Sequence, residues 1–179
     1  MQFKSNIFIL PGLGNSGEGH WQTIWQNRFG FKRIEQSSWD APVCDDWIAR
    51  IDEEVMKQPT LSDIILVGHS LACTTIAQWA AIYNRVIKGA LLVAPSDTEA
   101  ESYPDGTIGF KPMCLKPIQF PSIVVMSSDD FYVTPQRAAF FAYSWGSKLE
   151  NIGNAGHINV SSGFGEWDEG LQFLQKLDQ

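Results

Sequence analysis

The sequence predicts one α/β domain, in which a mostly parallel sheet of about six strands lies between two layers of helices. Short apolar, β-branched runs alternate along the chain with longer segments of helical periodicity, which is typical of parallel sheets covered on both faces. The length of 179 residues suits one domain with a buried core and leaves little room for a second domain or a large cap. We therefore expect a three-layer α/β/α domain that spans residues 1–179.

The predicted strands and helices follow one another in regular alternation. Six apolar runs are predicted to be strands, at residues 6–10, 33–36, 63–67, 90–93, 122–126 and 148–152. Five further segments are predicted to be helices, at residues 20–30, 44–58, 71–84, 135–146 and 166–177. In the second of these helices the apolar residues fall on one stripe, which comprises Trp47, Ile48, Ile51, Val55 and Met56.

Residues 95–121 differ from the rest of the chain. They are rich in proline, contain two glycines and show no periodicity, which predicts a long surface loop. Long loops in compact domains are often functional. We therefore expect this segment to contribute to a binding site.

Charge and composition argue against several classes of protein. A net charge of -7 disfavours a nucleic-acid partner, because such binding depends largely on Lys and Arg. No apolar run is long enough to span a membrane, and residues 7–11 are too short for the core of a signal peptide. The cysteines Cys44, Cys73 and Cys114 are widely spaced and odd in number, which favours neither disulfides nor a metal or redox site. We expect a cytoplasmic protein with no membrane association.

The segment Gly68-His69-Ser70-Leu71-Ala72 follows the most apolar predicted strand and begins a predicted helix. This pattern is typical of a nucleophile elbow, a sharp turn that lifts a serine hydroxyl clear of the sheet and needs small residues on either side. Ala72 stands where glycine is commonest. We predict that Ser70 is a nucleophile and that the N–H of Leu71, at the helix start, donates to the oxyanion.

A nucleophilic serine needs a base within hydrogen-bonding distance, and the pKa of histidine suits that role. The chain has three histidines. His69 adjoins the nucleophile, and its side chain is expected to point away from Ser70. His20, beside the glycine-rich loop, is expected to bond to the backbone, with an approach to the site as the alternative. We therefore predict that the base is His157, in the loop after the last predicted strand.

The acid that orients this histidine is expected after the preceding strand, at the same edge of the sheet. Asp129 and Asp130 both occupy that place. We favour Asp130, because the residues that follow it suit a side chain that turns toward His157. The order of serine, aspartate and histidine along the chain is the one expected for a nucleophile elbow of this kind.

The loop after the first predicted strand, residues 11–17, contains three glycines. Glycine lets the backbone come close to a reacting oxygen. We predict that the N–H of Leu13 is the second donor to the oxyanion, with Gly12 as the alternative.

A rival interpretation of the same loop is a dinucleotide-binding site. The spacing Gly12-x-Gly14-x-x-Gly17 matches such loops, and Glu35 lies near the position of a ribose-binding acid. That interpretation requires Gly17 to lie inside a helix, whereas Gly19 indicates that the loop continues. It also leaves the serine, aspartate and histidine without a role, so we keep it only as an alternative.

Five segments resemble a known family. They are Pro11–Gly14, Gly19–Trp25, Gly68–Cys73, Gly156–Asn159 and Ser162–Trp167. They closely resemble the small serine-hydrolase family that includes retinoblastoma-binding protein 9 and the bacterial YdeN-type proteins, and the resemblance covers nearly the whole chain. It implies a minimal α/β-hydrolase fold without a lid, esterase-like activity on small acyl substrates, no cofactor and no metal, and a triad at Ser70, Asp130 and His157. Ala72 departs from the usual glycine, which implies less space beside the nucleophile.

We expect a serine hydrolase that cleaves small acyl esters through an acyl-enzyme. The pocket is expected to be shallow and open, with walls from the glycine loop, residues 96–120 and the segment around Phe131 and Tyr132. A second possibility is a non-catalytic protein-binding scaffold with a hydrolase fold, although no protein partner is predicted. The tryptophans of the family motifs, Trp21, Trp25 and Trp167, are expected to pack in the core or at its rim, with a role in an acyl pocket as the alternative.

Overall fold

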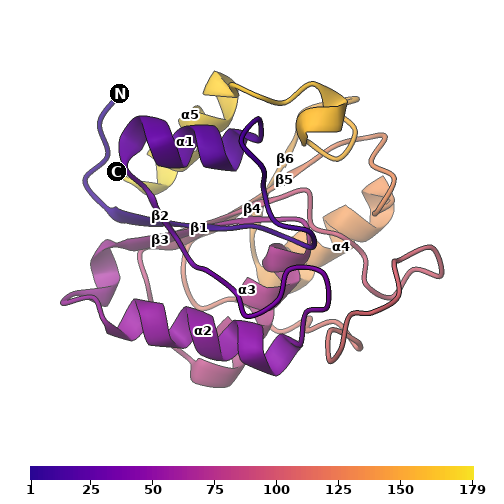
Figure 1. Ribbon diagram of the computed structural model, residues 1–179, viewed down its shortest axis with the longest axis horizontal. Coiled ribbons are helices and arrows are strands. Elements are labelled where there is room, and N and C mark those ends of the chain that lie inside the picture. The colour runs from indigo at the N-terminus through magenta and orange to yellow at the C-terminus, as the bar shows by residue number, and fades with distance from the viewer.

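Six parallel strands form one sheet between two layers of helices in the computed structural model, which describes residues 1–179 (Figure 1). The strands are β1 (Asn6–Leu10), β2 (Lys32–Arg33), β3 (Ile64–His69), β4 (Gly89–Val93), β5 (Ser122–Met126) and β6 (Lys148–Asn151). The helices are α1 (Trp21–Phe29), α2 (Cys44–Met56), α3 (Leu71–Tyr83), α4 (Pro135–Trp145) and α5 (Asp168–Leu177), with 3-10 turns η1 (Leu61–Asp63) and η2 (Val160–Ser162). The predicted α/β class is confirmed, and every strand pair is parallel.

The strand order β2-β1-β3-β4-β5-β6 places a reversal next to the middle of the sheet. The chain passes from β1 outward to β2 and then returns to the other side of β1 to form β3. A parallel sheet of this kind opens a crevice at the carboxyl ends of the strands where the order reverses. Leu10 and Gly68 pair at those ends, so the loops that follow β1 and β3 are neighbours.

Alternate residues of the central strands enter two separate cores, because successive side chains of a strand point to opposite faces. A core of 32 buried residues lies between the sheet and α2, α3 and α4, and includes Leu66 and Val124. A core of 18 buried residues lies against α1 and α5, and includes Ile65 and Val125. Figure 1 shows α1 and α5 on one side of the sheet and α2 and α3 on the other.

The second strand is shorter than the predicted range of 33–36. Lys32 and Arg33 pair with Phe8 and Ile9, and one further bond joins the N–H of Ile34 to the carbonyl of Ile9 at 3.0 Å. The cause is the position of β2 at the edge of the sheet, where β1 is its only neighbour. Because β1 ends at Leu10, no partner remains for the rest of the predicted strand.

Residues 95–121 contain no helix or strand, as predicted, but they do not form a loop confined to the surface. Five large side chains of this segment are buried in the core beside α2, α3 and α4: Tyr103, Phe110, Met113, Ile118 and Phe120. The end of α4 fixes the segment, since the Trp145 indole N–H donates to the carbonyl of Cys114 at 2.7 Å. The absence of periodicity therefore predicted the irregular backbone correctly, but the prediction that the segment lies on the surface was wrong for these five side chains.

Two of the three cysteines are buried and none is in a disulfide. Burial raises the pKa of the Cys44 thiol to about 12 and raises that of Cys73 as well. Both thiols are therefore in the protonated, weakly reactive form at neutral pH. None of the helices combines the length and the apolar composition that crossing a bilayer requires.

Candidate active site

Ser70 occupies the sharp turn between β3 and α3, at the edge of the sheet where the strand order reverses. Its backbone has a φ of 57° and a ψ of -122°, a conformation that residues other than glycine rarely adopt. The N–H of Ser70 donates to the carbonyl of Val93 at 2.9 Å, which ties the turn to β4. A Cβ at Gly68, two residues before Ser70, would lie 2.7 Å from the Ile76 side chain and 3.3 Å from the backbone of Ala72, so glycine lets α3 pack close to the end of β3.

Ala72 does not crowd the nucleophile. Its side chain is buried in the core beneath α3, and the residue is not part of the lining of the cavity beside Ser70. The narrowing that the resemblance implied is therefore not observed.

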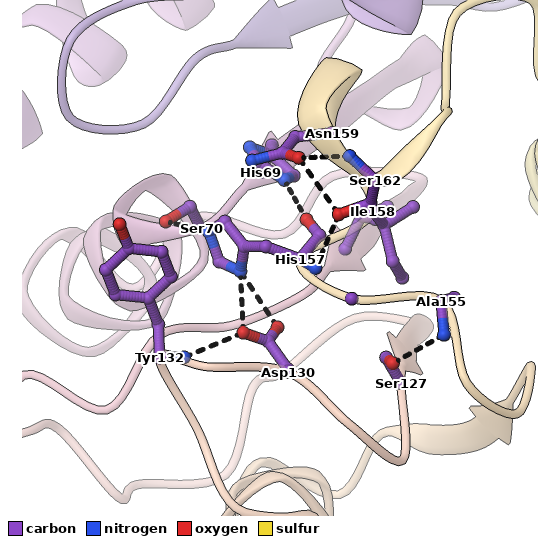
Figure 2. A network of polar contacts seen from close by, with 12 residues as sticks. His69, Ser70, Ser127, Asp130, Tyr132, Ala155, His157, Ile158, Asn159 and Ser162 are labelled. Carbon is purple, nitrogen blue, oxygen red and sulfur yellow. Dashed lines mark hydrogen bonds and ion pairs between the residues drawn. The ribbon is translucent and has the colours of Figure 1, made fainter.

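The three predicted triad side chains form one chain of hydrogen bonds (Figure 2). Ser70 Oγ lies 2.8 Å from His157 Nε2, and His157 Nδ1 lies 2.8 and 3.0 Å from the two carboxylate oxygens of Asp130. Because a carboxylate can only accept, the proton of the neutral imidazole is on Nδ1 and Nε2 is left to accept from the serine hydroxyl. The Asp130 side chain is fully buried, and its ionisable partner is His157. The pair is therefore shielded from water on the side of the carboxylate. This geometry allows His157 to remove the proton of Ser70.

Asp129 makes no hydrogen bond to the imidazole and instead accepts from the loops around it. Its carboxylate accepts from Ser127 Oγ at 2.7 Å and from the N–H of Gly156 at 2.8 Å. The hydrogen bond from Ser127, followed by that from Gly156, holds the pKa of Asp129 below its usual range. The two neighbouring carboxylates therefore have different partners. Asp130 accepts a hydrogen bond from the His157 ring, and Asp129 accepts one from the backbone N–H of the residue before His157.

Two serines that the sequence did not single out support the loop that carries His157. Ser127 Oγ accepts from the N–H of Ala155 at 2.9 Å, and Ser162 Oγ accepts from the N–H of His157 at 3.1 Å. Figure 2 shows these hydroxyl groups on either side of the loop. Ser162 lies within the Ser-Gly-Phe-Gly family motif, whereas only its proximity to the predicted aspartates pointed to Ser127.

Trp21, Trp25 and Trp167 form a buried aromatic group, here called the tryptophan cluster. The Trp21 ring lies 4.6 Å from that of Trp25 and 5.2 Å from that of Trp167, and the last two rings are stacked at 5.7 Å. The predicted packing role is confirmed, because all three are core residues and none lines the cavity. In addition, the Trp21 indole N–H donates to the carbonyl of Ile158 at 2.8 Å, directly after His157.

The other two histidines lie beside the triad in neutral form. His69 Nε2 donates to the backbone carbonyl of His157 at 2.9 Å, and its ring lies 4.8 Å from that of His20. Desolvation lowers the pKa of His69 well below its usual value. Desolvation, with a smaller effect of Arg33, lowers the pKa of His20 to about 4. As predicted, His20 bonds to the backbone, because its Nδ1 accepts from the N–H of Gln22 and caps α1.

The glycine loop touches the elbow at Gly12. A Cβ at this position would lie 2.8 Å from the His69 carbonyl, 2.9 Å from Ser70 Cβ and 3.2 Å from the Leu71 nitrogen. Leu71 is the first residue of α3, so its N–H has no acceptor within the helix. The N–H of Leu13 also makes no hydrogen bond, and Leu13 lines the cavity. Both predicted oxyanion donors are therefore free at the same edge of the sheet.

The dinucleotide interpretation does not match the geometry of this loop. Helix α1 begins at Trp21, so Gly17 lies outside it, and Gly12 packs against the nucleophile turn. Glu35 lines a separate surface depression beside α2 rather than the cavity at Ser70.

A cavity of about 170 Å³ lies beside Ser70. Its lining comprises Leu13, Asn15, His20, His69, Ser70, Tyr103, Pro104, Tyr132, His157 and Asn159. The predicted walls are therefore present, since these residues come from the glycine loop, the 95–121 segment and the turn after β5. A larger depression of about 440 Å³ near the N-terminus has no histidine in its lining. No group of three or more His, Cys, Asp or Glu side chains is placed to hold a metal ion.

Comparison with known proteins gives a consistent result. A family model described as serine hydrolase matches residues 7–176. A YdeN-like protein of Pectobacterium atrosepticum is 30% identical over 97% of this chain and 90% of its own, with a TM-score of 0.84. The ydeN gene product of Bacillus subtilis is 18% identical over 97% of this chain and 98% of its own, with a TM-score of 0.75. Est1E of Butyrivibrio proteoclasticus, solved with ferulic acid bound, is 14% identical over 96% and 88%, with a TM-score of 0.68. No curated protein matches the chain.

Proposed function

Because this chain belongs to the serine hydrolase family, we propose that it hydrolyses small carboxylic esters through an acyl-enzyme formed on Ser70. The observation that carries the proposal is the chain of hydrogen bonds from Ser70 through His157 to Asp130, with distances of 2.8 Å at both links. The strained backbone of Ser70 supports it further, since such strain is typical of functional positions.

The first half of the proposed reaction acylates the serine. Ser70 Oγ attacks the carbonyl carbon while its proton passes to His157 Nε2, and the carbonyl oxygen becomes an oxyanion. The N–H groups of Leu71 and Leu13 donate to that oxyanion, and removal of one such donor typically costs about 100-fold to 1000-fold in kcat. His157 then returns the proton to the departing alcohol, which leaves the acyl group on the serine oxygen.

The second half releases the acid. Water attacks the acyl carbon as its proton passes to His157 Nε2, and the same oxyanion donors act again. The proton then moves to Ser70 Oγ as the carboxylic acid leaves. Asp130 holds the imidazole with its proton on Nδ1 and stabilises the imidazolium that forms in each half.

The dimensions of the cavity support short acyl groups. A volume of about 170 Å³ is below the range of roughly 300 to 1,000 Å³ that is typical of pockets for drug-sized ligands. Within a series of 4-nitrophenyl esters, we expect kcat/KM to be highest for acyl chains of two to about four carbons. A preference for chains of about ten carbons or more would contradict this part of the proposal.

The test of the mechanism is labelling by a fluorophosphonate, together with hydrolysis of 4-nitrophenyl acetate. Ser70→Ala and His157→Ala are each expected to abolish labelling and turnover. Ser62→Ala is the matched control, because Ser62 is exposed in η1 at the opposite end of β3 and should not affect either reaction. A folded wild-type protein that neither labels nor turns over would instead support a non-catalytic binding scaffold.

A further inference from the structure

The cavity beside Ser70 presents polar groups whose hydrogen-bonding character is fixed by the surrounding protein. Asn15 Oδ1 accepts from the N–H of Ser16 at 2.8 Å and from the Arg33 guanidinium at 2.6 Å. Both partners can only donate, so the oxygen and nitrogen of the amide are assigned without ambiguity. The free end of Asn15 is therefore its NH₂ group, a donor.

Asn159 is committed in the same way. Its Oδ1 accepts from the N–H of Ser162 at 3.1 Å and from the hydroxyl groups of Ser161 and Ser162 at 2.7 and 3.1 Å. The backbone N–H again can only donate, so the oxygen faces η2. The NH₂ group makes no hydrogen bond within the protein, and this residue lines the cavity.

His20 presents a third donor. Its Nδ1 accepts from the N–H of Gln22 at 3.2 Å, so the proton of the neutral ring must be on Nε2. With a pKa of about 4, the ring stays neutral and keeps this tautomer at neutral pH. Nε2 makes no hydrogen bond within the protein, and it is not one of the fully buried polar atoms that lack a partner. Because His20 lines the cavity, this N–H is available to a molecule bound there.

Donors outnumber acceptors among the groups with a fixed role. Outside the triad, the acceptor with a fixed role is Nδ1 of His69, whose Nε2 donates to the His157 carbonyl. The hydroxyl groups of Tyr103 and Tyr132 can act either way. No Asp, Glu, Lys or Arg lines the cavity. An apolar ligand would leave the donors without partners, which is unfavourable, whereas a charged ligand would meet no counter-ion.

We propose that the substrate is a small, uncharged ester with a second acceptor oxygen, such as an ether oxygen, that accepts a hydrogen bond from Nε2–H of His20. This inference rests on the proposed esterase function and specifies its substrate class. The second oxygen belongs either to the acyl group or to the alcohol, and both sources share the same chemistry. His20 is thus a specificity-determining residue that bonds to the substrate and takes no part in proton transfer.

The experiment compares esters that differ by one replacement of CH₂ by oxygen. On the acyl side the pair is 4-nitrophenyl methoxyacetate and 4-nitrophenyl butanoate, and on the alcohol side it is 2-methoxyethyl acetate and butyl acetate. The kcat/KM ratio within each pair is measured for the wild type, His20→Asn and His20→Phe. Because intrinsic ester reactivity is the same for every variant, it cancels when the ratios are compared between proteins.

His20→Asn keeps a helix cap, but its amide N–H lies closer to the backbone than Nε2 does, so the donor is displaced from its place in the cavity. His20→Phe keeps the ring volume and removes both the cap and the donor. We expect the preference for the oxygen-containing ester to fall about fivefold to tenfold in both variants for one pair, and that pair identifies the side of the ester that carries the oxygen. If the ratios of both pairs are unchanged in His20→Phe, which has no donor at this position, the inference is wrong while the esterase function stands. If the wild type hydrolyses none of the four esters and resists fluorophosphonate, the proposed function itself fails.

Discussion

At Gly12 the absence of a side chain determines how closely the glycine loop approaches the nucleophile. A Cβ there would lie 2.8 Å from a backbone oxygen and 2.9 Å from Ser70 Cβ, so Gly12→Ala must displace the loop. We predict that kcat falls about 100-fold or more, since the N–H of Leu13 moves away from the oxyanion.

Gly17→Ala is the control for this change, because Gly17 belongs to the same loop and a Cβ there would meet no atom within 4 Å. Steady-state kinetics with 4-nitrophenyl acetate should show near wild-type values for Gly17→Ala. Equal kinetics for the two variants would argue against an oxyanion donor in this loop.

The two neighbouring aspartates offer a second test at the level of single residues. Asp130→Asn keeps the shape of the side chain but favours the wrong imidazole tautomer, and we predict a fall in kcat of about four orders of magnitude with a nearly unchanged melting temperature. Asp129→Asn should instead lower the melting temperature, because Asp129 accepts hydrogen bonds from Ser127 and Gly156. A larger loss of kcat in Asp129→Asn would reverse the assignment of the two carboxylates.

Sequence reasoning predicted those residues of the candidate site that belong to short local patterns. Ser70 has its small neighbours in a strand-to-helix context, and His157 and Asp130 follow predicted strands. Ser127 supports the histidine loop across 28 positions of sequence, through a bond to Ala155 that exists only because β5 and β6 are adjacent. No local pattern encodes such a contact.

Helix α1 is joined to the histidine loop through the indole of its first residue, Trp21. Trp21→Phe removes the hydrogen bond to the carbonyl of Ile158 but keeps an aromatic ring in the tryptophan cluster. We predict a loss of about 1 kcal/mol in the free energy of unfolding and a fall in kcat with little change in KM, since Trp21 acts by positioning His157.

Trp25→Phe is a closely matched control. Trp25 belongs to the same cluster, but its indole nitrogen has no hydrogen-bond partner. The two variants therefore differ mainly in the bond to Ile158, and both free energies of unfolding can be measured in urea. The positioning role of Trp21 is wrong if Trp25→Phe lowers kcat as much as Trp21→Phe does.

Among the elements, the central strands were predictable because both of their faces are buried and their residues are continuously apolar. Strand β2 was placed too late in the sequence, since its length depends on where β1 ends. The buried side chains of residues 95–121 were also missed, because irregular backbone has no period from which burial can be inferred.

At the scale of the whole molecule, the buried neutral histidines make stability depend on pH. The pKa of His20 is about 4 in the folded protein and about 6.5 in an unfolded chain, so between these values the unfolded chain binds a proton that the folded protein does not. The stabilisation is fully present above about pH 6.5 and is lost as the pH falls toward 4. His69, whose pKa is also lowered, acts in the same direction.

We predict that His20 contributes about 2 to 3 kcal/mol to the loss of unfolding free energy between pH 7 and pH 4.5. Urea denaturation of the wild type and His20→Phe at both pH values isolates this contribution, because the carboxylates titrate in both proteins. The decrease should be smaller by that amount in the variant, even though the lost cap lowers its stability at pH 7. Parallel decreases in the two proteins would show that His20 is not held neutral.

The tryptophan cluster also gives the molecule an optical signal of its own. Trp25 and Trp167 are stacked with 14° between their planes, and Trp21 contacts both rings. Transitions of indoles this close couple, so the cluster should produce an exciton signal in the circular dichroism spectrum that Trp25→Phe changes, although the Trp21–Trp167 pair remains. Because the Trp21 N–H donates to the carbonyl of Ile158, directly after His157, intrinsic fluorescence should respond to a change in this hydrogen bond without an attached dye.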